Sequence, residues 1–230
     1  MPIISFANSK GGSGKTTSAL LLACELSLKK DVCIIDADPR HPIQKWTGLK
    51  KEKSNSLHVF TNDSENTIIQ DIENYSHQYP FVIIDLEGIA SKRAAFAISQ
   101  SDFVIIPMQE QQQDADEAIN VIKEIKNLEK MTRKKIHFSI LFTKTRVVAK
   151  SRTARFIAQQ FITSEKIDCF QTEINERDAF SAIFTTGDTV RGLNPQENNG
   201  ISKAIENIEK YAAEVITKVL ETQSQGENHV

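Results

Sequence analysis

The stretch ANSKGGSGKTTSAL, residues 7–20, decides the fold of this chain. Its Gly14–Thr16 segment matches the end of the phosphate-binding pattern G-x-x-x-x-G-K-[ST], but Ser9 occupies the position of the first glycine. The apolar run Ile3–Ala7 precedes the glycines, and a segment of helical period follows them. A strand, a glycine-rich loop and a helix in this order predict that backbone N–H groups at the helix start face phosphate oxygens.

The same alternation of apolar runs and helical segments continues along the chain. Further strands are expected at Val32–Asp36, Leu57–Thr61, Phe81–Asp85, Phe103–Pro107, Ile136–Thr143 and Asp168–Gln171. Helices are expected at 15–30, at 64–78 with Ser64 as the cap, at 114–130 and at about 199–222. Runs that are apolar throughout are typical of parallel strands covered on both faces. The fold class predicted is therefore α/β, a doubly wound and mostly parallel sheet of about seven strands, as in P-loop NTPases.

Length and composition are those of an ordinary globular protein. The 230 residues and the net charge of −2 fit a single domain over 1–222, followed by a polar tail at 223–230. The three cysteines are scattered, which favours reduced thiols over a metal site. The sequence shows neither a signal peptide nor a run of about 20 apolar residues, so we expect a cytoplasmic protein without membrane attachment.

The loop residues predict binding of ATP with Mg²⁺. Lys15 is expected to neutralise the β- and γ-phosphates, the Thr16 hydroxyl to bind Mg²⁺, and Thr17 to reach the α-phosphate. The remaining nucleotide-binding positions are Gly11, Gly12, Ser13 and Gly14. Strand ends supply three carboxylates, Asp36 and Asp38 after one apolar run and Asp85 after another. Carboxylates at this edge of the sheet suit a divalent cation and an attacking water.

KGGSGKTT, residues 10–17, resembles the deviant phosphate loop K-G-G-x-G-K-[ST] of the MinD and ParA group of ATPases. This resemblance implies that Lys10 crosses a dimer interface to phosphates bound by the other subunit. It also implies catalytic roles for Lys10, Lys15 and Asp38, with Asp38 positioning the water. Asp36, Asp85 and Thr16 would then hold Mg²⁺.

Two positions depart from the pattern of these relatives. Arg40 follows the first switch where many relatives have glutamine, and DLEG, residues 85–88, replaces D-x-P-P-G. Glu87 matches no catalytic position of the family and is expected to be a solvated loop residue.

Among these ATPases, the chain is most similar to the small ParF-like partition proteins and to the VirC-type ATPases of T-DNA transfer. The segments that carry this similarity are SFANSKGGSGKTT, DADPRHPIQKW, DFVIIPMQEQQQDADEA and INERDAFSAIF. The resemblance implies a homodimer formed on ATP binding, nonspecific DNA binding, and an adaptor protein on the cargo that stimulates hydrolysis.

Charge distribution supports a DNA partner. The window 123–155 holds eleven Lys or Arg residues against Glu124 and Glu129, a local charge of about +9 within a chain of net charge −2. The resemblance to ParA relatives, which place a DNA-contacting arginine in the corresponding segment, implies Arg177 as a further candidate for DNA contact. Thr143–Arg146 is a candidate for the base pocket because of its place at a strand end.

Three alternatives remain open at the level of sequence. The first is a VirC-like accessory ATPase that brings a transfer origin to a secretion machine. The second is a protein-cargo positioning ATPase without DNA binding. The third is a metabolic enzyme on the same fold, such as a synthetase of the dethiobiotin type, for which Lys10 would be dispensable.

Overall fold

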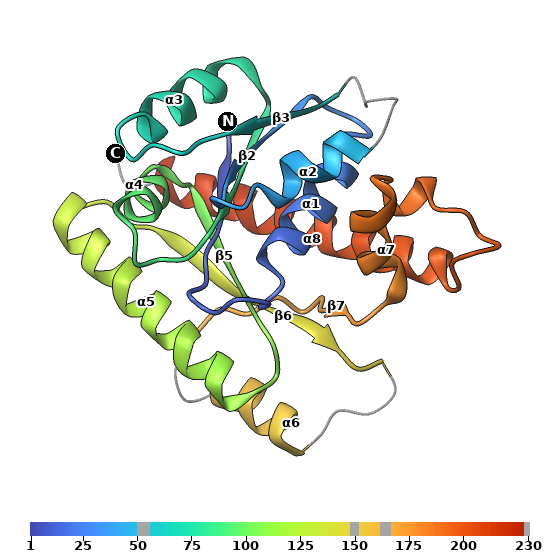
Figure 1. The fold of residues 1–230 in the computed structure, drawn as a ribbon. Helices are drawn as coiled ribbons and strands as arrows, with labels where there is room; N and C mark the ends of the chain where they lie inside the picture. The colour runs from blue at the N-terminus through green and yellow to red at the C-terminus, as the bar shows by residue number, and fades with distance from the viewer. Residues whose placement is uncertain (50–55, 148–151, 162–166, 228–230) are drawn as a thin grey trace.

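The computed structural model describes residues 1–49, 56–147, 152–161 and 167–227 (Figure 1). Its centre is a sheet of seven strands in the order β3-β2-β4-β1-β5-β6-β7, and every neighbouring pair is parallel. The strands are β1 Ile3–Phe6, β2 Val32–Ala37, β3 Leu57–Thr61, β4 Phe81–Leu86, β5 Phe103–Met108, β6 His137–Thr145 and β7 Ile174–Asn175. The predicted doubly wound α/β fold is confirmed.

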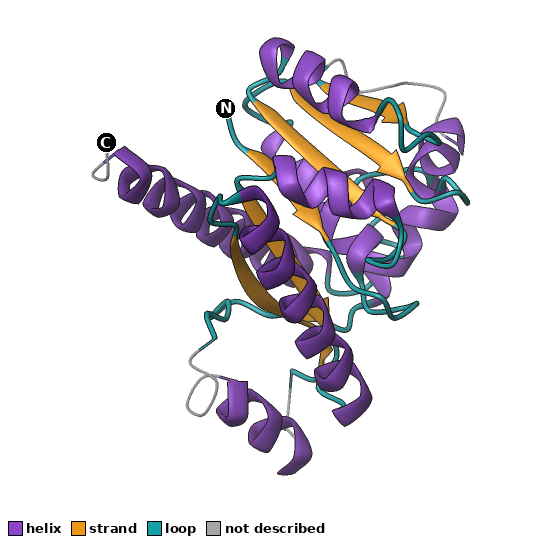
Figure 2. Ribbon diagram, turned by 90° about the vertical axis from the view of Figure 1, so that its left-hand side faces the viewer, coloured by secondary structure: helices purple, strands orange, loops and turns teal. Residues whose placement is uncertain are grey.

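Helices cover both faces of the sheet (Figure 2). One face packs against α1 Lys15–Leu26, α2 Pro42–Leu49, α7 Asp178–Thr186 and α8 Ile201–Glu227. The other face packs against α3 Ile68–Gln78, α4 Lys92–Gln100, α5 Gln112–Thr132 and α6 Arg152–Gln159. Among the described residues, none of these helices is long and apolar enough to cross a membrane.

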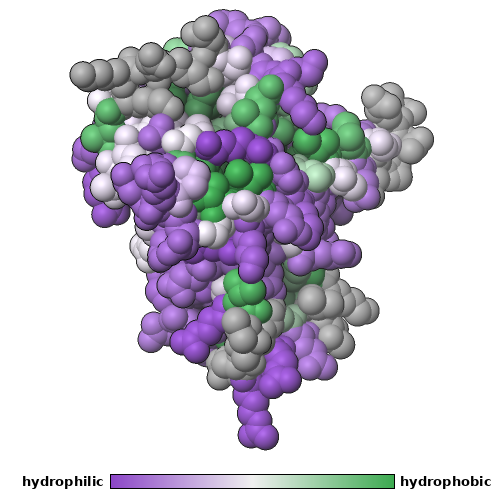
Figure 3. Space-filling view, turned by 90° about the vertical axis from the view of Figure 1, so that its right-hand side faces the viewer, coloured by the Kyte–Doolittle hydropathy of each residue, from purple (hydrophilic) through white to green (hydrophobic). Residues whose placement is uncertain are grey.

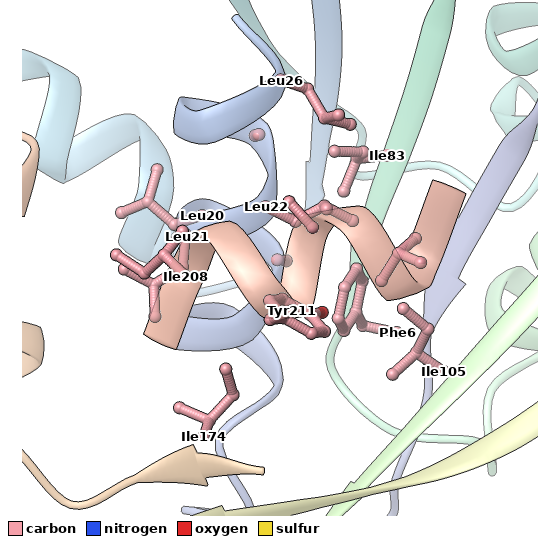
Figure 4. Close-up of a cluster of buried hydrophobic side chains, with 14 of the residues drawn as sticks. Phe6, Leu20, Leu21, Leu22, Leu26, Ile83, Ile105, Ile174, Ile208 and Tyr211 are labelled. Carbon is pink, nitrogen blue, oxygen red and sulfur yellow. The ribbon is translucent and has the colours of Figure 1, made fainter. Parts of the chain in front are cut away.

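The apolar runs of the sequence form the core. Strands β2 and β5 are buried at every position, as expected of strands that are covered on both faces. Between α1, α8 and the sheet, Tyr211 and Phe6 are buried against Leu22 and Ile105 (Figure 4). This packing fixes α1, and therefore the loop at its N-terminus, against the central strand β1.

Several element boundaries differ from the sequence-based expectations. The last strand is β7 at Ile174–Asn175, whereas the predicted strand 168–171 contributes a single bridge between Cys169 and Ile140. A strand of two residues is too short to show a periodic pattern. Helix α3 begins at Ile68 rather than at Ser64, and α8 continues to Glu227, beyond the expected end at 222.

The strand order positions the phosphate loop. β1 lies between β4 and β5. The strands β2, β3 and β4 lie on one side of it, and β5, β6 and β7 lie on the other. The loop that follows β1 therefore lies at the carboxyl edge of the sheet where the strand order reverses, which is the usual ligand position in open α/β sheets.

Candidate nucleotide site

The loop between β1 and α1 has the backbone of a phosphate cradle. Gly12 and Gly14 have φ angles of 79° and 94°, a region that favours glycine. A Cβ atom at Gly14 would also lie 3.1 Å from the side chain of Thr143. Ser9, at the position of the missing first glycine, is not among the residues with positive φ, and its hydroxyl contacts Glu117. The loop therefore needs glycine at positions 12 and 14 and tolerates serine at position 9.

A cavity of about 290 Å³ opens beside this loop. Its lining comprises Gly11, Gly12, Gly14, Lys15, Thr16, Thr17, Asp38, Arg40, Pro42, Glu87 and Lys144. The buried Lys15 ammonium donates to the backbone carbonyl of Lys10 at 3.3 Å, and burial lowers the pKa of Lys15 while Asp85 and Asp38 oppose this shift. Ser13 is buried, and its backbone carbonyl accepts a hydrogen bond of 2.7 Å from Thr143.

Three carboxylates lie close to the cavity. Asp36 and Asp85 are register partners on the paired strands β2 and β4, and both are fully buried. Asp36 Oδ2 accepts from the backbone N–H groups of Ile43 and Gln44, at 2.8 and 2.9 Å, at the start of α2. Asp38 lines the cavity, and its Oδ1 accepts from the backbone N–H of Arg40 at 2.8 Å.

Asp85 is the most perturbed of the three carboxylates. Within the described part of the chain, neither of its side-chain oxygens has a hydrogen-bond partner. Burial raises the pKa of Asp85 to about 7; the neighbouring Asp36 adds to this rise, and Thr16 and Lys15 oppose it. Burial likewise raises the pKa of Asp36. Both Asp85 oxygens and Oδ1 of Asp36 are thus buried without a donor among the described residues, and they fit a cation, which would supply the missing positive charge.

These residues fit Mg²⁺ that is shared with a nucleotide. The described residues contain no group of three or more His, Cys, Asp or Glu side chains able to hold a metal alone. Mg²⁺ in nucleotide sites uses one or two carboxylates and completes its shell with phosphate oxygens and water. Asp36, Asp85 and the Thr16 hydroxyl are the candidate protein ligands.

Lys10 lies outside its own phosphate cavity. Its ammonium is paired with Asp114, which is fully buried in the first turn of α5, while the Lys10 side chain is 30% exposed. Lys10 is absent from the lining of the cavity among the described residues. No local pattern in the sequence indicates a role for Asp114, because its pairing with Lys10 spans 104 positions.

Glu87 lies in the loop after β4, as expected, but it is only partly solvated. It lines the phosphate cavity, its side chain is 34% exposed, and a carboxylate oxygen lies 3.6 Å from Arg93 Nη2. Arg93 is itself buried and donates to the backbone carbonyl of Asn62 at 2.8 Å. This buried guanidinium holds the loop after β4 near the end of β3.

A second cavity, of about 170 Å³, adjoins the first and has Gly14, Thr17 and Lys144 in common with it. Its other lining residues are Ser18, Thr143, Ile174, Asn175, Glu176, Arg177, Phe180 and Ser181. The expected base segment 143–146 thus contributes Thr143 and Lys144. The residues from β7 and α7 are not among the expected base contacts, because the last strand lies at Ile174–Asn175 and not at the expected 168–171.

The structure divides the basic window into two groups. The α5-end group comprises Lys123, Lys126, Lys130, Arg133, Lys134 and Lys135, and the β6–α6 group comprises Lys144, Arg146, Arg152 and Arg155; all are exposed. The two groups lie at opposite ends of strand β6. Its nine residues span about 30 Å, at about 3.3 Å per residue. Lys150 lies outside the described residues. Arg177 is half-buried and donates to Asn175 at 3.3 Å, so it belongs to the second cavity.

Fold and site together define a P-loop ATPase of the ParA/MinD type. The chain belongs to the family described as VirC1 protein, whose model matches residues 1–222. It is 31% identical to the protein ParA of Rhizobium radiobacter over 222 residues, covering 96% of this chain and 99% of that protein. It is 25% identical to the protein virC1 of the same organism, covering 81% and 82% of the two chains.

Solved structures agree on the fold. An ATP complex of a variant of Cyanothece McdA superposes with a TM-score of 0.77 at 16% identity, covering 94% of this chain and 96% of that one. Family and fold make this chain a ParA-family positioning ATPase.

Proposed function

We propose that this chain is an ATP-dependent DNA-positioning protein that forms a homodimer around two MgATP molecules. In the dimer, each Lys10 leaves Asp114 and contacts the phosphates bound by the partner. The ATP-bound dimer binds DNA nonspecifically at the nucleoid. An adaptor on the cargo stimulates ATP hydrolysis, and hydrolysis releases the protein from the DNA. The position of Lys10 carries this proposal, since its ammonium is held away from the phosphate cavity of its own chain.

The roles of the site residues follow from their positions. Lys15 and the backbone of the loop bind the phosphates, and Asp38 orients the attacking water from the cavity wall. Bound Mg²⁺ would neutralise charge on the β- and γ-phosphates, with Thr16, Asp36 and Asp85 as its protein ligands. Lys10 of the partner would add a second cation where negative charge develops, in an interface from which water is excluded.

The second cavity is the proposed site of the nucleoside. It continues directly from the phosphate cavity, through Gly14 and Thr17. Phe180 offers an apolar surface, and Asn175 an amide that can both donate and accept hydrogen bonds. We assign Asn175 and Phe180 to the contact with the base.

DNA contact is assigned to the β6–α6 group. This group lies at the carboxyl edge of the sheet, and its Lys144 also lines the phosphate cavity, so nucleotide binding and DNA binding share one edge. The α5-end group lies about 30 Å away and is partly neutralised, because Lys126 pairs with Glu129 at 2.7 Å.

The experiment is to measure dimer mass and DNA retention together, with MgATP and with MgADP, at two salt concentrations. The wild type should be a dimer that retains DNA only with MgATP, and retention should fall steeply as salt rises. Lys10→Gln should remain a monomer with both nucleotides while still binding them. Lys203→Gln, which removes an exposed lysine on α8, is the matched control and should behave as wild type.

Equal DNA retention in MgATP and MgADP would refute the nucleotide switch. Full ATP turnover by monomeric Lys10→Gln would instead favour a metabolic enzyme on this fold. A MgATP dimer that ignores DNA would favour the positioning of a protein cargo.

A second candidate function is delivery of a transfer origin to a secretion machine. The match of the VirC1 family over residues 1–222 favours it, whereas the 31% identity to a protein named ParA favours plasmid partition. Loss of plasmid inheritance without loss of conjugative transfer, on deletion of the gene, supports partition; the opposite pattern supports delivery.

A further inference from the structure

A cavity of about 220 Å³ lies away from the nucleotide site, between α1, α2, β3, α8 and the segment that follows α7. Its wall is largely apolar and includes Leu21, Trp46, Leu57, Val59, Ile183 and Val190. Within the described part of the chain it has no lining residue in common with the two nucleotide cavities. A cavity of about 150 Å³ lined by aliphatic side chains already holds a benzene ring. This cavity is therefore large enough for a leucine or phenylalanine side chain.

Charged groups on the wall and beside the cavity limit what can enter it. Arg191 Nη2 lies 2.9 Å from Glu25 and 2.7 Å from Glu209, so two carboxylates surround one guanidinium. The cluster has a net charge of −1, and the Glu209 side chain is 53% exposed. Figure 3 shows the face that carries α7, where apolar side chains lie between polar ones. An apolar group with a positively charged neighbour would match both the cavity and the cluster.

Helix α2 links this cavity to the metal-binding carboxylates. Its N-terminal N–H groups, from Ile43 and Gln44, bind Asp36 Oδ2. Its Trp46 forms part of the cavity wall and donates from Nε1 to the backbone carbonyl of Asp188 at 3.1 Å. One short helix thus contacts the metal site at its start and the cavity along its length. A ligand that moves Trp46 would also change the hydrogen bonds that hold Asp36.

We propose that this cavity is the docking site for a peptide segment of the hydrolysis-stimulating partner, which inserts an apolar side chain flanked by lysine or arginine. Docking shifts α2 and thereby the Asp36 carboxylate. The regulatory part of this inference rests on the proposed function, whereas peptide binding itself does not require ATP or a dimer.

Trp46 provides a direct measurement, because it is the only tryptophan of the chain. The probe is the peptide acetyl-Lys-Leu-Phe-Lys-amide, titrated into the full-length protein while tryptophan emission is recorded. We expect a saturable change in emission, and at least about ten-fold weaker binding of acetyl-Glu-Leu-Phe-Glu-amide, since one factor of ten corresponds to ~1.4 kcal/mol. No saturable change up to the solubility limit of the peptide would overturn the proposal.

Two variants locate the binding. Glu209→Lys should weaken the basic peptide about ten-fold and strengthen the acidic one, whereas Glu221→Lys, an exposed change further along the same helix, should change neither. Thr189→Phe should fill the cavity and abolish binding, provided that thermal unfolding shows a folded protein. Binding that survives both Thr189→Phe and Glu209→Lys places the peptide elsewhere and overturns the proposal.

Failures of the two proposals are distinguishable. Lys10→Gln should bind the basic peptide as the wild type does. Peptide binding by a wild type that stays monomeric with MgATP would refute the dimer and leave the docking site intact. A MgATP dimer without selective peptide binding would refute the docking site alone.

Discussion

At the scale of single residues, the Lys10–Asp114 pair gives one ammonium two alternative partners. In the isolated chain Asp114 holds it, and in the proposed dimer the phosphates of the partner would. We predict that Asp114→Asn shifts the dimerisation midpoint in MgATP to an about thirty-fold lower protein concentration, because two ion pairs of ~1 kcal/mol each, one per protomer, no longer have to be broken. Sedimentation measures the midpoint. A weaker dimer with unchanged thermal stability would mean that Asp114 acts within the dimer instead.

Asp85 gives a prediction with a defined dependence on pH. Its pKa is raised from 3.8 to about 7, so the folded chain holds a proton that the unfolded chain releases near pH 4. Stability of the nucleotide-free protein is therefore lost as pH rises from about 4 to 7. Asp85→Asn should be more stable than wild type at pH 8 by on the order of 1–3 kcal/mol and no more stable at pH 4.

Urea unfolding in the absence of Mg²⁺ measures this difference in stability. The same variant should lose the additional stabilisation that MgADP gives the wild type. Equal stability of the two proteins at pH 8 would mean that Asp85 is solvated or paired in solution.

How far the sequence predicts the site depends on the distance between the residues that form it. The loop residues Gly11–Thr17 and the strand-end carboxylates were found because each lies in a local pattern that the fold preserves. Asp114 and Arg93 were not found, since their partners are set by the packing of distant segments. The contact of Glu87 with Arg93 was not predicted for the same reason, since Arg93 belongs to α4, a helix that is not among those expected from the sequence.

At the scale of elements, α4 has a side-chain cap that can be tested. Ser91 Oγ accepts from the backbone N–H of Ala94 at 3.1 Å, at the start of the helix that carries Arg93. Ser91→Ala should lower the free energy of unfolding by about 1 kcal/mol, measured by urea unfolding. Ser64→Ala is the control, since Ser64 lies in a turn before α3 and does not cap it; its effect should be smaller. An equal loss of stability in both variants would mean that the effect comes from removing a serine hydroxyl and not from losing the cap of α4.

The strands were easier to predict than the helices between them. Five of the predicted strands begin at the residues where β1 to β5 begin. Four of these are apolar runs that are buried almost throughout, whereas β3 is only half-buried. Helices α2 and α7 carry only short apolar patterns, because each covers part of a face already covered by α1 and α8. The second cavity also depends on α7 and β7, so the sequence predicted only its Thr143 and Lys144 side and not the residues that face them.

At the scale of the whole molecule, the two basic groups predict where DNA lies on the dimer. Arg152→Glu combined with Arg155→Glu should abolish DNA retention in MgATP, because both side chains are exposed in the β6–α6 group. Lys134→Glu combined with Lys135→Glu is the matched control and should retain most binding. Each lost phosphate contact should reduce the salt slope by about 0.9.

Both double variants should still form the MgATP dimer, which sedimentation verifies before DNA is added. A greater loss of DNA retention in the Lys134 and Lys135 variant would mean that DNA binds at the α5-end group instead.

Because β1 is the central strand, the segments on its two sides contribute different parts of the nucleotide site. Segments on the β2–β4 side supply the carboxylates for the metal, and segments on the β6–β7 side supply the proposed pocket for the base. A nucleotide that contacts both sides would therefore link the segments up to β4, in roughly the first 90 residues, to β6, β7 and α7, in roughly the last 100. Amide hydrogen exchange should therefore slow on both sides of β1 when the nucleotide binds. Inorganic phosphate alone should slow exchange only in the phosphate loop and the residues next to it.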